Sequence, residues 1–186
     1  GADVVLVDIG LDVSGATTHL VEDADLVAWV PDRSVQDHKW RHAVWLVAGS
    51  PYMPGAARLA AGAALRGGAG YVRLSTPGVA DPAAPVEAVT HPVDAEEWSA
   101  DVLDGAQRFA AVAIGPGLGR APSTVREVRH LVGALERPLV IDGDALWALG
   151  PDVVASCADR VAPTVLTPHD GEFARLGVPT TYLRTS

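Results

Sequence analysis

The residues best suited to chemistry lie in four short segments, each directly after a run of apolar residues. They are residues 49–55 (GSPYMPG), 115–119 (GPGLG), 142–144 (DGD) and 167–173 (TPHDGEF). In an α/β protein the turn after a buried strand lies where the sheet ends, and glycine there lets a ligand approach free backbone N–H groups. The four segments therefore favour binding of an anionic ligand such as a nucleotide.

The first of these turns fits neither of the common phosphate-binding loops. A Walker loop needs Gly, four residues and then Gly-Lys-Ser/Thr, whereas Pro54 stands at the place of the second glycine and no lysine follows. The GxGxxG dinucleotide pattern is absent as well. Gly49, Ser50 and Gly55 therefore either touch a ligand or form only a tight turn from strand to helix.

The second turn carries glycines at alternate positions, which let either a ligand or another backbone come close. Gly115, Gly117 and Gly119 therefore either bind a ligand or form only a bulge and turn without one.

The polar residues of the last two segments also permit two interpretations. Asp142 and Asp144 can hold Mg²⁺ through water, or cap a helix. His169 or Asp170 can cap the following helix, with Glu172 in its first turn. His169 can instead donate hydrogen bonds to phosphate or amide oxygens.

A basic cluster at residues 38–42 (HKWRH) is either a solvated linker or a cationic lip for nucleotide phosphates. We expect the five tryptophans to be packing residues rather than a stacking platform, and Cys157 to be a small apolar residue on a helix.

Composition limits the class of protein. The chain has 186 residues, of which 48% are apolar and 20% charged, so it can form a core. Its 14 basic and 23 acidic side chains leave a net charge of −9, which disfavours a nucleic acid partner. The sequence has no membrane-length apolar run, and its single cysteine fits a cytoplasmic location. The chain begins at Gly1 and not at methionine, as expected of a fragment.

Apolar runs alternate with helical segments along the chain. The pattern predicts strands within 2–11, 20–31, 43–49, 70–77, 86–89, 110–115, 138–146 and 164–176, and helices over 54–67, 100–109, 123–135 and, interrupted, 145–158. Ser123 is a candidate helix cap, and another helix is expected to begin near His169. Such alternation predicts a mainly parallel sheet covered on both faces, with right-handed crossovers.

Four motifs together resemble one family. The segment HKWRHAVWLVAGSPYMPGAARLAAGAALRGGAGYVRLSTP looks like the opening of the NAD(P)H-hydrate dehydratase family, and AIGPGLGR, PLVIDGDAL and LTPHDGEFARL follow in that family's order and spacing. The resemblance implies a ribokinase-like three-layer α/β/α fold with a mainly parallel central sheet, incomplete at the C-terminus in this chain.

The same resemblance implies repair of hydrated NADH and NADPH. ADP or ATP phosphorylates the hydroxyl of the damaged nicotinamide ring with the help of Mg²⁺, and elimination of phosphate restores the double bond. The expected partners are small-molecule nucleotides and, in a homo-oligomer, further copies of the chain.

Site residues follow by motif. Gly55 and Ala56 would line the pocket for hydrated NAD(P)H, Gly117 with Gly115 and Gly119 would approach the same ligand through backbone, and His169 would contact it. The assignment of Asp142 and Asp144 to the metal is our own inference from the residues.

The ends of the chain depart from the family pattern. VVLVDIGLD is similar to the last strand of an NAD(P)H-hydrate epimerase domain, so residues 1–30 are expected to be the tail of that domain and a junction. Residues 31–186 then form the N-terminal two-thirds of a dehydratase domain. The family's lysine-bearing strand and GTGD motif, with its catalytic aspartate, do not occur, and Trp40 stands where the family has glycine.

Two alternatives to a dehydratase fragment follow from these departures. One is a nucleotide-binding module without catalysis, and the other is a fragment of another ribokinase-like small-molecule kinase. A fragment would also leave a sheet edge that must pair with another chain.

Overall fold

The structure, a computed structural model, describes residues 7, 10, 12, 14–16, 19–30, 34–80 and 84–177. The chain divides into two compact units, one formed by Gly1–Ser34 with Pro179–Ser186 and the other by Val35–Val178. The predicted strand at 2–11 lies largely outside the described residues. The strand predicted within 20–31 is wrong, since α1 (Asp23–Trp29) is a helix. The backbone N–H of Glu22 donates to the Asp25 carboxylate, which favours a helix start.

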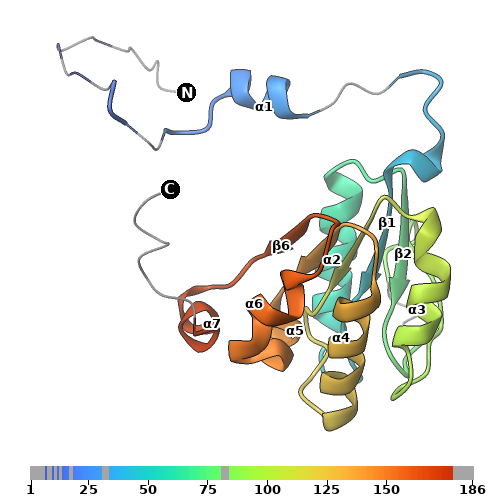
Figure 1. Ribbon diagram of the computed structural model, residues 1–186. Helices are drawn as coiled ribbons and strands as arrows, with labels where there is room; N and C mark the ends of the chain where they lie inside the picture. Colours follow the sequence, from blue (N-terminus) through green and yellow to red (C-terminus); the bar gives the residue numbers. More distant parts are fainter. Residues whose placement is uncertain are drawn as a thin grey trace. The chain divides into compact units, whose positions relative to one another are not determined.

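The second unit contains a six-stranded parallel sheet, and this confirms the predicted α/β class (Figure 1). The strand order is β3-β2-β1-β4-β5-β6. The strands are β1 (Ala43–Val47), β2 (Tyr71–Ser75), β3 (Val89–Thr90), β4 (Ala111–Ile114), β5 (Leu139–Ile141) and β6 (Thr164–Leu166). Because every pair is parallel, all strands end at one edge, here named the carboxyl edge. The order reverses between β1 and β4, which is where sheets of this kind bind ligands.

Helices cover both faces of the sheet (Figure 1). They are α2 (Pro54–Arg66), α3 (Ser99–Gly105), α4 (Pro122–Ala134), α5 (Gly143–Leu149), α6 (Val153–Ala158) and α7 (Asp170–Arg175), with single 3₁₀ turns η1 (Lys39–His42), η2 (Ala106–Arg108) and η3 (Gly150–Asp152). Alternate residues of β1 enter two separate cores. Trp45 packs in the cluster that includes residues of α3, α4 and α5, whereas Leu46 packs with Ala57 and Ala61 of α2. The alanine-rich face of α2 allows this close approach.

Two local expectations change. Ser123 is not a cap, because α4 already begins at Pro122 with Ala121 at the cap position. Proline tolerates that first position because its missing N–H has no partner there anyway. The helix expected over 100–109 divides into α3 and η2.

The basic cluster 38–42 lies at the opposite edge of the sheet from the four turns. It immediately precedes β1, and the carbonyl of His42 accepts a hydrogen bond from the N–H of Gly70, just before β2. The cationic-lip interpretation is therefore wrong for these turns, and Trp40 packs against Tyr71 and Phe109 instead. Within the described residues, no helix has the length and apolar character needed to span a membrane.

Candidate functional site

The two glycine-rich turns are joined at the point where the strand order reverses. The N–H of Gly49, after β1, donates to the carbonyl of Pro116, after β4, at 2.7 Å. Gly117 lies against the start of α2, where an added Cβ would stand 2.7 Å from Cβ of Ala56. The structure thus brings together two of the predicted binding residues, with Gly55 beside them at the first turn of α2.

The three glycines of the second turn have different surroundings, although all have positive φ. An added Cβ on Gly115 would lie 1.8 Å from the carbonyl oxygen of Asp142, so the turns after β4 and β5 meet here backbone to backbone. Gly119 has no atom within 4 Å of such a Cβ. Close packing within the protein therefore accounts for Gly115 and Gly117, whereas Gly119 faces open space. Their role in substrate binding stays a prediction.

Asp144 holds the second turn to α5. Its buried carboxylate accepts from the N–H of Gly119 at 2.9 Å and from Nε of Arg120 at 2.9 Å. Asp142 precedes α5 at the cap position and accepts instead from the hydroxyl of Thr167, after β6, at 2.8 Å.

These contacts leave little room for direct metal coordination by Asp144, since each of its oxygens already has a donor. Among the described residues, no three His, Cys, Asp or Glu side chains gather to hold an ion. The assignment of Asp142 and Asp144 to Mg²⁺ stays a prediction.

His169 caps α7, as one of its two interpretations predicted. Its Nδ1 accepts from the backbone N–H groups of Gly171 at 3.1 Å and Glu172 at 3.3 Å, and the Glu172 carboxylate accepts from the backbone N–H of His169 at 3.1 Å. Because Nδ1 is an acceptor, the proton of the neutral ring resides on Nε2. The side chain is 74% exposed, so this Nε2–H can also donate to a ligand oxygen. Capping and ligand binding are therefore compatible.

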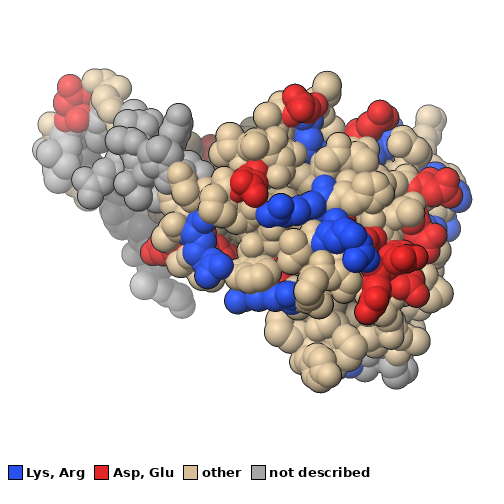
Figure 2. Space-filling model, turned by 60° about the horizontal axis from the view of Figure 1, so that its bottom comes forward, with Lys and Arg blue, Asp and Glu red and all other residues tan. Residues whose placement is uncertain are grey.

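A pocket of about 240 Å³ opens beside His169, between α5, α7 and the second turn. Two guanidinium groups contact the same indole in it: Arg120 lies 5.2 Å and Arg175 5.8 Å from the ring centroid of Trp147. The pocket is lined by Arg120, Leu146, Trp147, His169, Gly171, Glu172 and Arg175. In Figure 2, where the carboxyl edge turns toward the viewer, basic side chains gather near the middle of this face.

Sequence reasoning missed the two arginines and treated Trp147 as a packing residue. The only local signal is that Arg120 directly follows the glycine turn and Arg175 follows the TPHDGEF segment.

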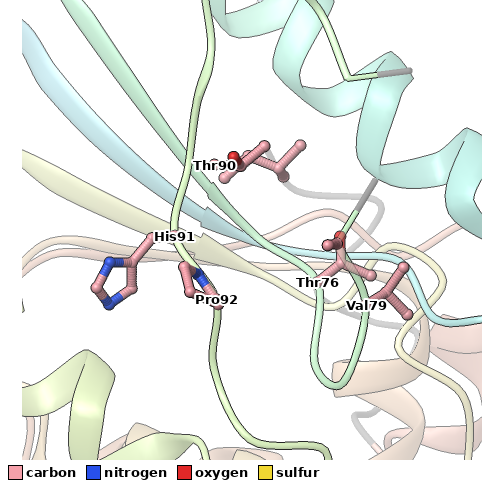
Figure 3. A pocket seen from close by; sticks show the side chains of 7 residues that line it. Thr76, Val79, Thr90, His91 and Pro92 are labelled. Carbon is pink, nitrogen blue, oxygen red and sulfur yellow. The ribbon is translucent and has the colours of Figure 1, made fainter. Parts of the chain in front are cut away.

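A second pocket, of about 220 Å³, lies at the ends of β2 and β3 (Figure 3). Thr76, Val79 and Thr90 border it, and the Thr76 hydroxyl donates to the carbonyl of Ala48 at 2.9 Å. The His91 side chain points away from this cavity (Figure 3) and contacts Trp45. Burial, and secondly the charge of Arg73, lower the pKa of His91. Leu74, Val79, Ala80 and Pro92 make the lining of this pocket mostly apolar.

The parallel sheet between helical layers, with glycine turns at its carboxyl edge, defines a three-layer α/β protein. A ribokinase-like superfamily protein from Enterococcus faecalis shares the fold, with a TM-score of 0.67 and 23% identity over 81% of this chain and 54% of that one. The chain belongs to the NAD(P)H-hydrate dehydratase family, whose family model matches residues 44–182.

Several members of the family are similar over most of this chain. A bifunctional NAD(P)H-hydrate repair enzyme of Salinibacter ruber is 40% identical over 83% of this chain and 31% of its own length. The ADP-dependent (S)-NAD(P)H-hydrate dehydratase of Bacillus subtilis is 36% identical over 84% of this chain and 55% of its own.

A crystal structure of the ADP/ATP-dependent NAD(P)H-hydrate dehydratase from B. subtilis, co-crystallised with ATP/Mg²⁺, matches with a TM-score of 0.65 and 34% identity over 86% of this chain and 56% of that one. The chain therefore spans about a third to about half of these relatives.

Proposed function

We propose that this chain forms the substrate half of an enzyme that dehydrates hydrated NADH and NADPH with ADP or ATP. The observation that carries the proposal is the common location of Ala56, Gly117 and His169, three residues assigned from separate motifs, at one edge of the sheet. Family membership and the similarity to a B. subtilis enzyme of this activity support it.

In this proposal the terminal P–O bond of ADP or ATP breaks, and its phosphoryl group moves to the hydroxyl oxygen of the hydrated ring. AMP or ADP is left, and the hydroxyl proton is released. The C–O bond then breaks, phosphate leaves, and a proton lost from the neighbouring ring carbon leaves its electron pair in the restored double bond. Phosphate is a far better leaving group than hydroxide, so this chain's task is to position the ring and stabilise charge. The Nε2–H of His169 would donate to an oxygen of the bound dinucleotide.

The proposal also includes Mg²⁺, although no three His, Cys, Asp or Glu side chains among the described residues gather to hold an ion. Mg²⁺ enters as the counter-ion of the ADP or ATP phosphates, in keeping with the B. subtilis relative, which was co-crystallised with ATP/Mg²⁺. The epimerase-like origin of residues 1–30, the homo-oligomer and the cytoplasmic location also stay predictions. The acidic charge of −9 argues against nucleic acid as a partner.

The test is ADP-dependent release of NADH from hydrated NADH, followed by the NADH absorbance. The chain is assayed alone and extended by the C-terminal segment of the B. subtilis relative. We expect turnover in the extended form only in the presence of ADP or ATP. No turnover by the extended form, together with no binding of hydrated NADH by either form, would show the proposal to be wrong.

A further inference from the structure

The pocket beside His169 holds a surplus of hydrogen-bond donors. Nε of Arg120 donates to Asp144, and the guanidinium group donates no other hydrogen bond among the described residues. Arg175 contacts the Trp147 ring, and within the same part of the chain its guanidinium has no hydrogen bond or ion pair. Each guanidinium carries five N–H donors in a planar fork, so most donors of this pair have no protein acceptor.

The acceptors around the pocket are already engaged. The Asp144 carboxylate accepts from the backbone N–H of Gly119 and from Nε of Arg120. The Glu172 carboxylate accepts from the backbone N–H of His169, and one of its oxygens lies 3.6 Å from the ring Nε2 of His169. The two carboxylates therefore offset the arginine charges, but apart from Nε of Arg120 they take up none of the guanidinium N–H donors. A ligand that satisfies them must bring its own anionic oxygens.

The shape and walls of the pocket limit what that ligand is. About 240 Å³ is less than the roughly 300–1,000 Å³ of a pocket that encloses a whole drug-sized ligand, so one part of a larger molecule fits here. Planar forks match the oxygens of phosphate bidentately, and the half-buried indole holds both arginines at one place. The walls suit a phosphate group next to an apolar ring or sugar.

We propose that Arg120 and Arg175, held on Trp147, bind a phosphate group of the hydrated dinucleotide whose ring lies at His169. The inference rests on the proposed function, because that function supplies the dinucleotide. Two phosphates have this chemistry: the pyrophosphate bridge, common to both forms of the substrate, and the 2′-phosphate, which only the NADPH form carries.

The test compares binding by the full chain and its Arg175→Gln variant. The probes are inorganic pyrophosphate, NAD⁺ and NADP⁺, and the readouts are calorimetry and quenching of the Trp147 fluorescence, identified with Trp147→Phe. Arg108→Gln is the matched control, because Arg108 lies over Trp40 at 4.2 Å in a similar pair at the opposite edge. Equal melting midpoints establish that each variant is folded.

We expect Arg175→Gln to weaken pyrophosphate binding about tenfold, as loss of a charge-assisted contact does, and Arg108→Gln to leave it unchanged. A larger loss for NADP⁺ than for NAD⁺ assigns the 2′-phosphate, and equal losses assign the pyrophosphate bridge.

Pyrophosphate binding that is absent, or equal in all three proteins, overturns the inference. If NAD⁺ and NADP⁺ also bind normally to Arg175→Gln, only this inference fails. If the wild-type chain binds pyrophosphate but neither dinucleotide, the proposed function is what fails.

Discussion

At the scale of the residue, His169 caps α7, and ligand binding is the second role that we propose for its ring. Nδ1 accepts two backbone N–H groups of α7, so the ring nitrogen that can donate to a ligand is Nε2, which lies 3.6 Å from a Glu172 carboxylate oxygen. The capping task was predictable, because a polar residue followed three positions later by glutamate is a helix-start pattern. The pocket beside it was not predictable, since folding alone brings Trp147 and Arg175 together from segments that are apart in the sequence.

Replacing His169 separates these tasks. His169→Asn keeps a side-chain acceptor suited to the cap, whereas His169→Ala removes it. We expect His169→Ala to lower the free energy of unfolding by about 1 kcal/mol and His169→Asn to lower it by less than half as much. Urea unfolding measures both; equal destabilisation by the two substitutions would contradict the capping role.

The glycines after β4 predict a graded series of alanine variants. Each position has positive φ, where a non-glycine residue costs roughly 1–2 kcal/mol. Gly119→Ala should cost only this backbone energy, since no atom lies within 4 Å of an added Cβ. Gly117→Ala adds a close contact with Ala56, and Gly115→Ala adds a clash with the Asp142 carbonyl that should raise the total cost above about 3 kcal/mol. Urea midpoints that do not fall in this order would contradict the packing described.

At the scale of the element, α3 and α4 are joined by one buried carboxylate. Glu127 of α4 accepts from the N–H of Ser99 at 3.0 Å and from its hydroxyl at 2.7 Å, and pairs with Arg126 at 3.0 Å. Burial alone would raise the pKa of Glu127, but the hydrogen bonds from Ser99 and Arg126 outweigh it and lower that pKa below 4.5. The ionised form is therefore the one that holds the two helices together.

This contact makes stability depend on acid pH. The folded pKa lies below the unfolded one, so the stabilisation is complete above about pH 4.5 and is lost as the pH falls through the lower, folded pKa. Glu127→Gln should cost about 1–3 kcal/mol near neutral pH and approach the wild type in acid. Exposed Glu136→Gln serves as the control. A difference between wild type and Glu127→Gln that does not change with pH would contradict this role.

Prediction of elements succeeded for the apolar runs of β1, β2 and β4 and failed for LVAWV, an apolar run of similar length that follows acidic residues. The apolar runs at β1, β2 and β4 indicate buried strands because both faces of a parallel sheet are covered. The segment LVAWV is too short for its period to decide between strand and helix. The helix α1 that contains most of it begins with the acidic residues Asp23 and Asp25, which favour a helix N-terminus.

At the scale of the whole molecule, Val35–Val178 contains the sheet, both apolar clusters and the candidate site. A unit with its own core is expected to fold alone. Removal of residues 1–34 should therefore change the melting midpoint of this unit by less than about 2 °C. Calorimetry of the shortened and full chains measures it, and loss of a cooperative transition in the shortened chain would contradict this independence.

The class and topology of the molecule were within reach of the sequence, since four ordered motifs and the alternation of elements agree with each other. The arrangement of side chains at the carboxyl edge could not be predicted from the sequence. The tryptophan and the arginines of its pocket come from separate segments and form no motif of fixed spacing.

The central claim is that this carboxyl edge binds hydrated nicotinamide dinucleotide through His169. Its most direct test is a calorimetric titration of the chain and of His169→Asn with hydrated NADPH. The account predicts saturable binding by the wild type and about tenfold weaker binding by His169→Asn, with the fold retained in both. Equal affinities of the two proteins, or no binding by the wild type, would contradict it.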